Sequence, residues 1–395
     1  MNDLDFTKLC DEHNPAIVSI TSMFYDKVQA VNTYSSSSGF LVEKDDKIYV
    51  ITSAHSVLRS TVNDPADDLS VGIYRINNVI GNNRAYKLKI VGVDGLADMA
   101  VCKIVSQKGQ ERPEIGKHKT ITIGNNLTTL PGATMFNIAN PLAKDLWSIS
   151  KGTLRDNKYL DPTGKYLSGC ITTSVPVYPS CSGSPFLNLD GECLGLVSFG
   201  FIDGKQNTQA GFAGGVGAFT MKIILDNIIS KKHVDIIETN NGKTYLSNRK
   251  AWFGHTDYIS INQNIYYAFK DNYANLNLNG ISMTRIPKNS PLANPIKGEP
   301  LREKDIILSL TNKYGEKINI GSTRDRYSPG IALWTFDPKE CAISTLEIIR
   351  NPKKNSNIDI IEVDFSLEIK SDEEAPPTTG DTKLADYMSK DCSIL

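Results

Sequence analysis

Short apolar runs alternate with polar turns along the first half of the chain. The runs hold four to six residues, are rich in β-branched side chains, and are bounded by clusters of Gly, Asn, Asp or Ser. This pattern is typical of a barrel or sandwich built from many short strands. The expected strands cover residues 16–20, 39–42, 48–51, 99–104 and 120–123.

Two further patterns predict how this part of the chain ends. Apolar runs at 186–189 and 192–199 flank Asp190-Gly191, a pair favoured in two-residue hairpin turns because such turns need positive φ. We therefore expect a hairpin here, with Ser182 on the loop that enters it. Farther on, residues 221–229 have apolar side chains on one helical face, which predicts a closing helix.

Length and composition indicate a globular protein with more than one domain. The 395 residues are 40% hydrophobic and 22% charged, and such a chain is too long for one compact core. The net charge of -1 provides no electrostatic footprint for nucleic acid, so we expect no nucleic-acid partner. No run of about 18 uncharged apolar residues occurs, which argues against a membrane-spanning segment.

The cysteines argue against a metal or redox site. Seven are scattered through the sequence without a C-x-x-C pair, so we expect no metal and no cofactor, and a reducing compartment is the simplest explanation. The chain begins with an acidic stretch that no apolar run follows, unlike a secretion signal. Together these features predict an intracellular (cytoplasmic) location, or one in a virion.

Residues 178–187 read Tyr-Pro-Ser-Cys-Ser-Gly-Ser-Pro-Phe-Leu and have the form of a nucleophile loop around Ser182. A serine that attacks a peptide carbonyl needs a base, a carboxylate that holds the base, and backbone N–H groups aimed at the developing oxyanion. His55 stands at the end of an expected strand and is the best candidate for the base. Asp98 directly precedes another strand and is the best candidate for the carboxylate, with Asp94 as its nearest rival.

The segments around these residues form an ordered series along the chain. They are 14–20, 38–42, 51–55, 97–101, 140–141, 150–154, 172–174 and 179–185. In this order they resemble the HtrA/Deg branch of the chymotrypsin-fold serine proteases. The resemblance implies a mainly β protein, with a chymotrypsin-like double β-barrel and the site between two six-stranded barrels. It also implies Ser182 as the nucleophile, His55 as the general acid and base, and Asp98 as the residue that orients the histidine.

The resemblance assigns the oxyanion hole to the backbone N–H groups of Ser180 and Ser182. Position 180 is usually Gly in this family, and Ser reaches the required conformation less easily. Loss of one donor costs on the order of 10²-fold or more in rate. Two function classes therefore stay open. One is a serine endopeptidase that cleaves polypeptides; the other is a weakly active or inactive protease-fold protein that binds peptides like a chaperone.

A cysteine nucleophile is a rival for the chemistry, because some viral proteases of this fold use one. In those proteins the nucleophile directly precedes the Gly of the loop. Ser182 holds that place here, and Cys181 occupies the variable position before it. We therefore expect Cys181 to be a bystander.

The resemblance also indicates how a substrate would bind. Ser198-Phe199-Gly200 is similar to the family segment whose main chain pairs with an extended substrate strand, a mode called β-augmentation. Pro176 and Val177, with the Gly-rich run 211–215, are expected to line the primary specificity pocket. None of these residues is charged, so we expect an apolar residue before the scissile bond. The alternative is that they only form barrel core.

Residues 249–370 are expected to form a second domain. Taken in order, several of their segments resemble a PDZ-like α+β domain of the kind that follows HtrA proteases. The resemblance implies that the loop Trp252-Phe253-Gly254 offers backbone N–H groups to the C-terminal carboxylate of a peptide ligand. The alternative is a degenerate module that only packs against the protease part. The matching segments are 280–286, 289–292, 301–310 and 344–350.

The predicted organisation has five parts: an N-terminal extension, a trypsin-like protease domain, a polar linker, the PDZ-like domain and an acidic, Pro-rich tail that is typical of disorder. The resemblance is also compatible with a homo-oligomer. The five parts cover residues 1–13, 14–229, 230–248, 249–370 and 371–395.

The last four residues, Cys392-Ser393-Ile394-Leu395, fit two motifs loosely. They approach a prenylation box, so membrane contact is expected only if Cys392 is lipidated. They also have the form of a PDZ ligand, with a hydroxyl residue two before an apolar terminus. An ordinary frayed terminus is the simplest alternative.

Overall fold

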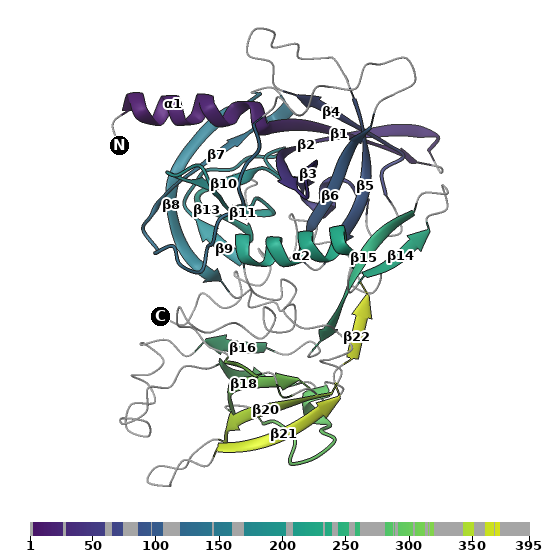
Figure 1. Ribbon diagram of the computed structural model, residues 1–395, viewed down its shortest axis with the longest axis vertical. Coiled ribbons are helices and arrows are strands. Elements are labelled where there is room, and N and C mark those ends of the chain that lie inside the picture. The colour runs from purple at the N-terminus through teal and green to yellow at the C-terminus, as the bar shows by residue number, and fades with distance from the viewer. Residues whose placement is uncertain are drawn as a thin grey trace. The chain divides into compact units, whose positions relative to one another are not determined.

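The computed structural model (Figure 1) divides into two compact units. The first unit comprises Met1–Asn157, Cys170–Asn248 and Asp372–Leu395, and the second comprises Lys158–Gly169 and Arg249–Ser371. The residues that the structure describes are 3–26, 29–59, 65–73, 86–95, 97–105, 119–143, 146–159, 170–202, 208–231, 234–238, 244–252, 257–260, 281–286, 288, 291–302, 305–312, 315, 317–319, 343–350, 360–366 and 368–371.

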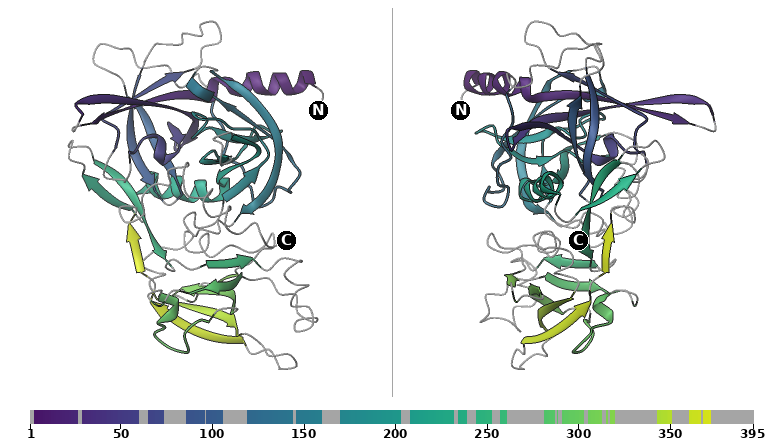
Figure 2. Two further views of the ribbon diagram at one scale, coloured as in Figure 1. Left: turned by 180° about the vertical axis from the view of Figure 1, so that it is seen from behind. Right: turned by 45° about the vertical axis from the view of Figure 1, so that its right-hand side comes forward.

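Six antiparallel strands close the first barrel. Their hydrogen bonds run in a ring, β1–β2–β3–β6–β5–β4 and back to β1. Val18, Leu41 and Val50 are among the buried side chains that fill it. Figure 2 shows β1 and β2 continuing beyond the barrel as a two-stranded ribbon. The strands are β1 (Ile17–Asp26), β2 (Val31–Lys44), β3 (Lys47–Thr52), β4 (Asp68–Ile73), β5 (Tyr86–Asp94) and β6 (Met99–Val105).

The second barrel follows along the chain. Its sheet has the order β11-β10-β7-β8-β9-β13-β12, and a bridge between Gly195 and Gly217 joins β11 to the end of β13. Met135, Phe186 and Leu194 lie in its core. The predicted double β-barrel is therefore confirmed. The strands are β7 (Thr134–Ala139), β8 (Ser148–Tyr159), β9 (Cys170–Thr173), β10 (Pro185–Asn188), β11 (Cys193–Leu196), β12 (Phe199–Ile202) and β13 (Thr208–Val216).

The predicted hairpin is present as β10 and β11, but its turn is longer than two residues. Gly191 has φ +76°, and the Asn188 N–H donates to the carbonyl oxygen of Glu192 at 3.0 Å. The side-chain Oδ1 of Asn188 accepts from the N–H groups of Asp190 and Glu192, at 3.0 and 2.9 Å. This Asx-type bonding stabilises the wider turn.

Residues 120–123 were predicted to form a strand, but they connect the two barrels instead. The Ile121 N–H donates to the Leu41 carbonyl of the first barrel at 2.8 Å, and the Thr122 carbonyl accepts from the Cys193 N–H of the second barrel at 2.8 Å. Within the segment only Ile123 forms a bridge, with Cys193. These β-branched residues therefore form an extended connector and not a strand, because their hydrogen-bond partners alternate between the two sheets.

Helices cover parts of the first unit. The N-terminal extension contains α1 (Asp3–His13), whose Phe6 ring packs edge-on against Phe136 at 5.3 Å. The Lys151 ammonium lies 4.5 Å from the centre of the Phe6 ring. The predicted closing helix is confirmed as α2 (Ala218–Ser230).

The segment predicted as a polar linker, 230–248, contains strands. β14 (Val234–Glu238) pairs antiparallel with β15 (Thr244–Trp252), and β15 pairs parallel with β5 at Gly92 and Val93. β5 pairs with β4 only near Tyr86. The rest of that edge of β5 is therefore open, and β15 adds to the first barrel there instead of leaving it as a free linker.

The second unit contains an antiparallel sheet with the order β16-β17-β18-β20-β21, and β19 pairs with β18. Leu310, Leu346 and Phe365 are fully buried in it. β22 pairs with the last four residues of β15. The strands are β16 (Asp257–Ser260), β17 (Ile281–Arg285), β18 (Ile306–Asn312), β19 (Lys317–Asn319), β20 (Ile343–Ile349), β21 (Ile360–Ser366) and β22 (Glu368–Ser371).

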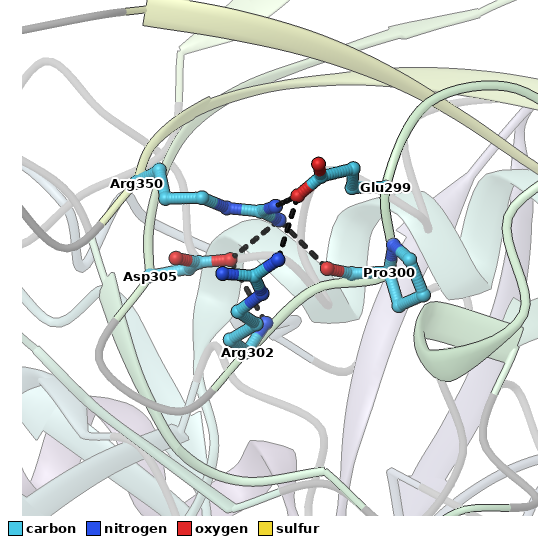
Figure 3. A network of polar contacts seen from close by, with 5 residues as sticks. All are labelled: Glu299, Pro300, Arg302, Asp305 and Arg350. Carbon is cyan, nitrogen blue, oxygen red and sulfur yellow. Dashed lines mark hydrogen bonds and ion pairs between the residues drawn. The ribbon is translucent and has the colours of Figure 1, made fainter.

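A cluster of charges joins the segments before β18 and after β20 (Figure 3). Asp305 is fully buried, and its Oδ2 accepts from the Arg302 N–H at 2.8 Å and from the Arg350 guanidinium at 3.1 Å. Glu299 pairs with both arginines. A buried carboxylate is costly unless it is paired, so this network stabilises the sheet of the second unit.

Candidate active site

The first barrel brings His55 and Asp98 together. His55 lies in a short 3-10 turn, Ala54–Ser56, that follows β3, and Asp98 lies just before β6. β3 and β6 are paired, with Thr52 opposite Ala100. The ring Nδ1 of His55 is 2.7 Å from Asp98 Oδ2, and the backbone N–H of His55 donates to Asp98 Oδ1 at 2.9 Å. The carboxylate therefore holds both the ring and the backbone of the histidine.

Asp98 is fully buried and has φ +54°, a strained conformation for a non-Gly residue. Its backbone carbonyl accepts from the Ala54 N–H at 3.1 Å. Asp94, the rival carboxylate, accepts from the Ala97 N–H at 2.8 Å. Asp94 thus braces the turn that presents Asp98, and Asp98 makes the contacts with His55.

The loop that carries Ser182 is pressed against the first barrel. The Ser38 N–H donates to the Ser182 carbonyl at 2.9 Å. Gly183 has φ +85°, and a Cβ there would overlap Thr52 Oγ1 and the Ser38 carbonyl. Only glycine fits this contact. Thr52 is the last residue of β3, the strand that leads to His55. The close contact of Gly183 with Thr52 therefore places the partly exposed Ser182 near the segment that carries the histidine.

Ser180 adopts the conformation that glycine reaches more easily, with φ +75°. Left-handed backbone costs a non-Gly residue roughly 1–2 kcal/mol. The carbonyl before it, that of Pro179, accepts from the Leu142 N–H at 2.7 Å. Because a trans peptide points its C=O and N–H in opposite directions, the Ser180 N–H faces away from Leu142.

The Ser182 N–H is set in the same way. The preceding carbonyl, that of Cys181, accepts from the Ser184 N–H at 3.0 Å and from the Ser184 hydroxyl at 2.6 Å. Among the described residues, neither the Ser180 N–H nor the Ser182 N–H has a hydrogen-bond partner. The backbone N–H groups of Ser180 and Ser182 therefore point away from the carbonyl groups of their own loop.

Ser184 has a structural role that the sequence alone did not suggest. Its hydroxyl is fully buried and accepts from Asn137 Nδ2 at 2.8 Å. The same Nδ2 donates to the Pro185 carbonyl at 2.8 Å. Asn137 lies on β7, so Ser184 anchors the loop that carries Ser182 to the wall of the second barrel.

Cys181 is buried beneath the loop. Its Sγ accepts from the Tyr178 N–H at 3.4 Å. Burial raises the pKa of the Cys181 thiol to about 11, and the hydrogen bond from Tyr178 only partly offsets this. A thiol with a raised pKa is a poor nucleophile at neutral pH.

The residues expected to contact substrate lie partly together. Val177 Cγ2 is 3.0 Å from the position that a Cβ would take at Gly200. Phe199 and Gly200 pair with Gly214 and Ala213, and the Ser198 N–H donates to the Gly214 carbonyl at 2.9 Å. Pro176, half-buried, directly precedes Val177.

The predicted carboxylate loop falls mostly outside the described residues. Trp252 ends β15, whereas Phe253 and Gly254 lie outside, as does the C-terminal Cys392. Within the described ranges no group of three or more His, Cys, Asp or Glu could hold a metal ion. No described helix is long and apolar enough to cross a membrane.

Residues 37–196 match the trypsin-like peptidase domain family. This region is an HtrA-like trypsin-fold protease domain. The HtrA-type protease AlgW, solved with a tripeptide, has the same fold: the TM-score is 0.55 at 14% identity, covering 92% of this chain and 97% of that chain.

Curated relatives extend the match. The serine protease Do-like HtrA of Bacillus subtilis is 26% identical over 251 residues, which are 58% of this chain and 51% of that protein. A probable periplasmic DegP-like serine endoprotease of Marinomonas is 25% identical over 279 residues, 71% of this chain and 49% of that protein. The HtrA-like chain thus spans about half the length of these relatives.

The predicted intracellular or virion location is contradicted by the relatives. Proteins of Marinomonas, Pseudomonas savastanoi and Halomonas elongata are named as probable periplasmic serine endoproteases. One of the two arguments for an intracellular location rested on the cysteines. Five of them are free and buried: Cys10, Cys102, Cys170, Cys181 and Cys193. Buried thiols stay reduced because oxidants do not reach them, so they do not report on the compartment.

The buried thiol leads to a test with iodoacetamide. With a pKa of about 11, only about one Cys181 side chain in 10⁴ is a thiolate at pH 7. We expect Cys181 in the folded protein to be alkylated at least about 100-fold more slowly than in urea, because the unfolded thiol has an ordinary pKa. The folded-state rate should rise about tenfold per pH unit, since the reactive thiolate increases until the pH reaches the pKa. Mass spectrometry of the Cys181 peptide measures both rates, and rapid alkylation of the folded protein at pH 7 would restore the cysteine as a candidate nucleophile.

Proposed function

We propose that the protein is a serine endopeptidase in which Ser182 is the nucleophile, His55 the general acid and base, and Asp98 the carboxylate that orients the histidine. The proposal rests on the two hydrogen bonds of the Asp98 carboxylate, one with the ring and one with the backbone N–H of His55. With Nδ1–H donated to the carboxylate, the basic lone pair of the neutral ring is on Nε2. The contact of Gly183 with Thr52 supports a nearby Ser182 hydroxyl.

The chemistry proceeds in two halves. His55 Nε2 accepts the Ser182 hydroxyl proton while Oγ bonds to the substrate carbonyl carbon, and the oxygen becomes an oxyanion that accepts from the N–H groups of Ser180 and Ser182. As the C–N bond breaks, His55 returns the proton to the leaving amine, which leaves an acyl-enzyme. Water then attacks the ester carbonyl while His55 takes one of its protons. The bond between the carbonyl carbon and Ser182 Oγ breaks, His55 returns the proton to Oγ, and the carboxylic acid leaves.

Peptide binding by relatives supports this reading. AlgW has been solved with a tripeptide and with a decapeptide, and the curated relatives are named serine proteases. We propose polypeptides as the substrates of this chain. The segment Ser198-Phe199-Gly200 would pair with the substrate main chain, as edge strands do in β-augmentation.

A phosphonate probe for serine hydrolases tests the nucleophile. We expect the wild type to be labelled covalently at Ser182 and Ser182→Ala to be unlabelled. Asp98→Asn should label about 10³- to 10⁴-fold more slowly, because an amide stabilises the wrong histidine tautomer. Intact-mass spectrometry over time gives the rates, with circular dichroism to show that each variant is folded. If folded wild type takes up no label, the peptide-binding alternative is favoured instead.

The pocket residues predict a preference for apolar side chains. Pro176 and Val177 carry no charge to pair with a basic substrate residue, and Val177 reaches toward Gly200. We expect cleavage of a peptide library predominantly after apolar residues, as read by mass spectrometry of the products. A cleavage profile dominated by Arg or Lys would contradict this specificity.

We further propose that the second unit captures C-terminal peptides in the manner of a PDZ domain. β16 follows the loop that begins at Trp252, and among the described strands it pairs only with β17, so its other edge suits an added peptide strand. We expect fluorescein-labelled peptides with free apolar C-termini to bind the full chain, and the same peptides with amidated C-termini to bind at least about tenfold more weakly, in an anisotropy titration. Equal affinity for the free and the amidated peptides would argue for a degenerate module that only packs against the protease part.

A further inference from the structure

Ser38 contacts both residues that carry the proposed oxyanion donors. It lies on β2 of the first barrel and is fully buried. Its N–H donates to the Ser182 carbonyl at 2.9 Å, and its hydroxyl donates to the Ser180 carbonyl at 2.8 Å. One residue of the first barrel therefore holds two carbonyls of the nucleophile loop on the second.

The direction of the Ser38 hydroxyl follows from its partners. The backbone N–H of Asn140 donates to Ser38 Oγ at 2.9 Å, and Asn140 Nδ2 also lies within reach at 3.3 Å. A serine hydroxyl has one hydrogen and two acceptor positions. Because Asn140 uses the acceptor side, the single hydrogen points to the Ser180 carbonyl.

Asn140 is itself held firmly. Its Oδ1 accepts from the Trp147 N–H at 3.0 Å, and its Nδ2 donates to the Val18 carbonyl at 3.2 Å. The Trp147 ring N–H donates to the Ile17 carbonyl at 3.0 Å. The loop between Asn140 and Trp147 is thus tied to β1, and it supplies the Leu142 N–H that holds the Pro179 carbonyl.

We propose that Ser38 is a positioning residue for the oxyanion hole, an inference that rests on the proposed function. Ser180 is strained at φ +75°, and its two flanking peptide planes are held by Leu142 on one side and Ser38 on the other. The Ser38 hydroxyl keeps Ser180 in this conformation, and so keeps its N–H where an oxyanion forms. Without the hydroxyl, the partly buried Ser180 carbonyl loses its partner and the strain favours rotation of the loop.

Ser38→Ala tests the inference, with Ser37→Ala as the matched control. Ser37 is also buried, on the same strand, but its hydroxyl has no hydrogen-bond partner among the described residues, so its removal should leave activity unchanged. For Ser38→Ala we expect kcat on a fluorogenic peptide amide with an apolar residue before the scissile bond to fall about 10- to 100-fold, with KM within about twofold. The affinity for a peptide aldehyde, whose hemiacetal oxygen occupies the oxyanion hole, should weaken by a similar factor.

The outcomes separate this inference from the proposed function. A wild type that neither reacts with the phosphonate nor binds the aldehyde overturns both. An active wild type with unchanged kcat and aldehyde affinity in Ser38→Ala overturns the inference alone, as does an equal loss in Ser37→Ala. If Ser38→Ala does not fold, Ser38→Cys keeps a similar size with a weaker donor. The kcat of Ser38→Cys should then be below that of the wild type, and full wild-type kcat would contradict the role of the hydroxyl.

Discussion

The candidate site depends on one close approach between the two barrels. Gly183 lies so near Thr52 and the Ser38 carbonyl that no side chain fits. This contact fixes the distance between the loop that carries Ser182 and the strand that leads to His55. A larger residue would have to push the barrels apart, because close-packed interiors do not yield by more than a few tenths of an ångström without cost. The geometry of the candidate site is therefore a property of the interface between the barrels and not of either barrel alone.

Buried charge imposes the second constraint. Asp98 is fully enclosed, and an ionised carboxylate in that position is costly unless it is paired and hydrogen-bonded. The N–H and the ring of His55 supply its partners, while Asp94 holds the Ala97 N–H and so shapes the turn. The same rule operates in the second unit, where Arg302 and Arg350 satisfy the buried Asp305. In both places the partners of the buried carboxylate lie on short segments that adjoin strands.

Left-handed backbone occurs on two neighbouring loops of the second barrel, one between β7 and β8 and the other between β9 and β10. Leu142, Trp147 and Ser180 all have positive φ, and hydrogen bonds from Ser38 and Asn140 connect their segments. Strained backbone persists only where the surroundings over-determine it. A serine in a place that favours glycine is therefore tolerated, because its neighbours on both sides supply the hydrogen bonds that hold it.

The choice of His55, Asp98 and Ser182 as a set rests on short motifs and a family resemblance, and it stays a prediction. The amino-acid sequence alone correctly predicted the strands near 16–20, 39–42, 48–51 and 99–104 and the closing helix, because these depend on local apolar patterning. It misjudged 120–123 and 230–248, whose extended segments found partners in sheets formed elsewhere in the chain. It also misjudged the cellular location, because the burial of a thiol is not visible in its spacing. Only the tertiary structure decided the contacts of Ser38, Asn140 and Ser184, which depend on how the two barrels fold and pack. Ser38 and Ser180 are 142 residues apart, and no local pattern reports which carbonyl a buried hydroxyl will reach once two barrels close.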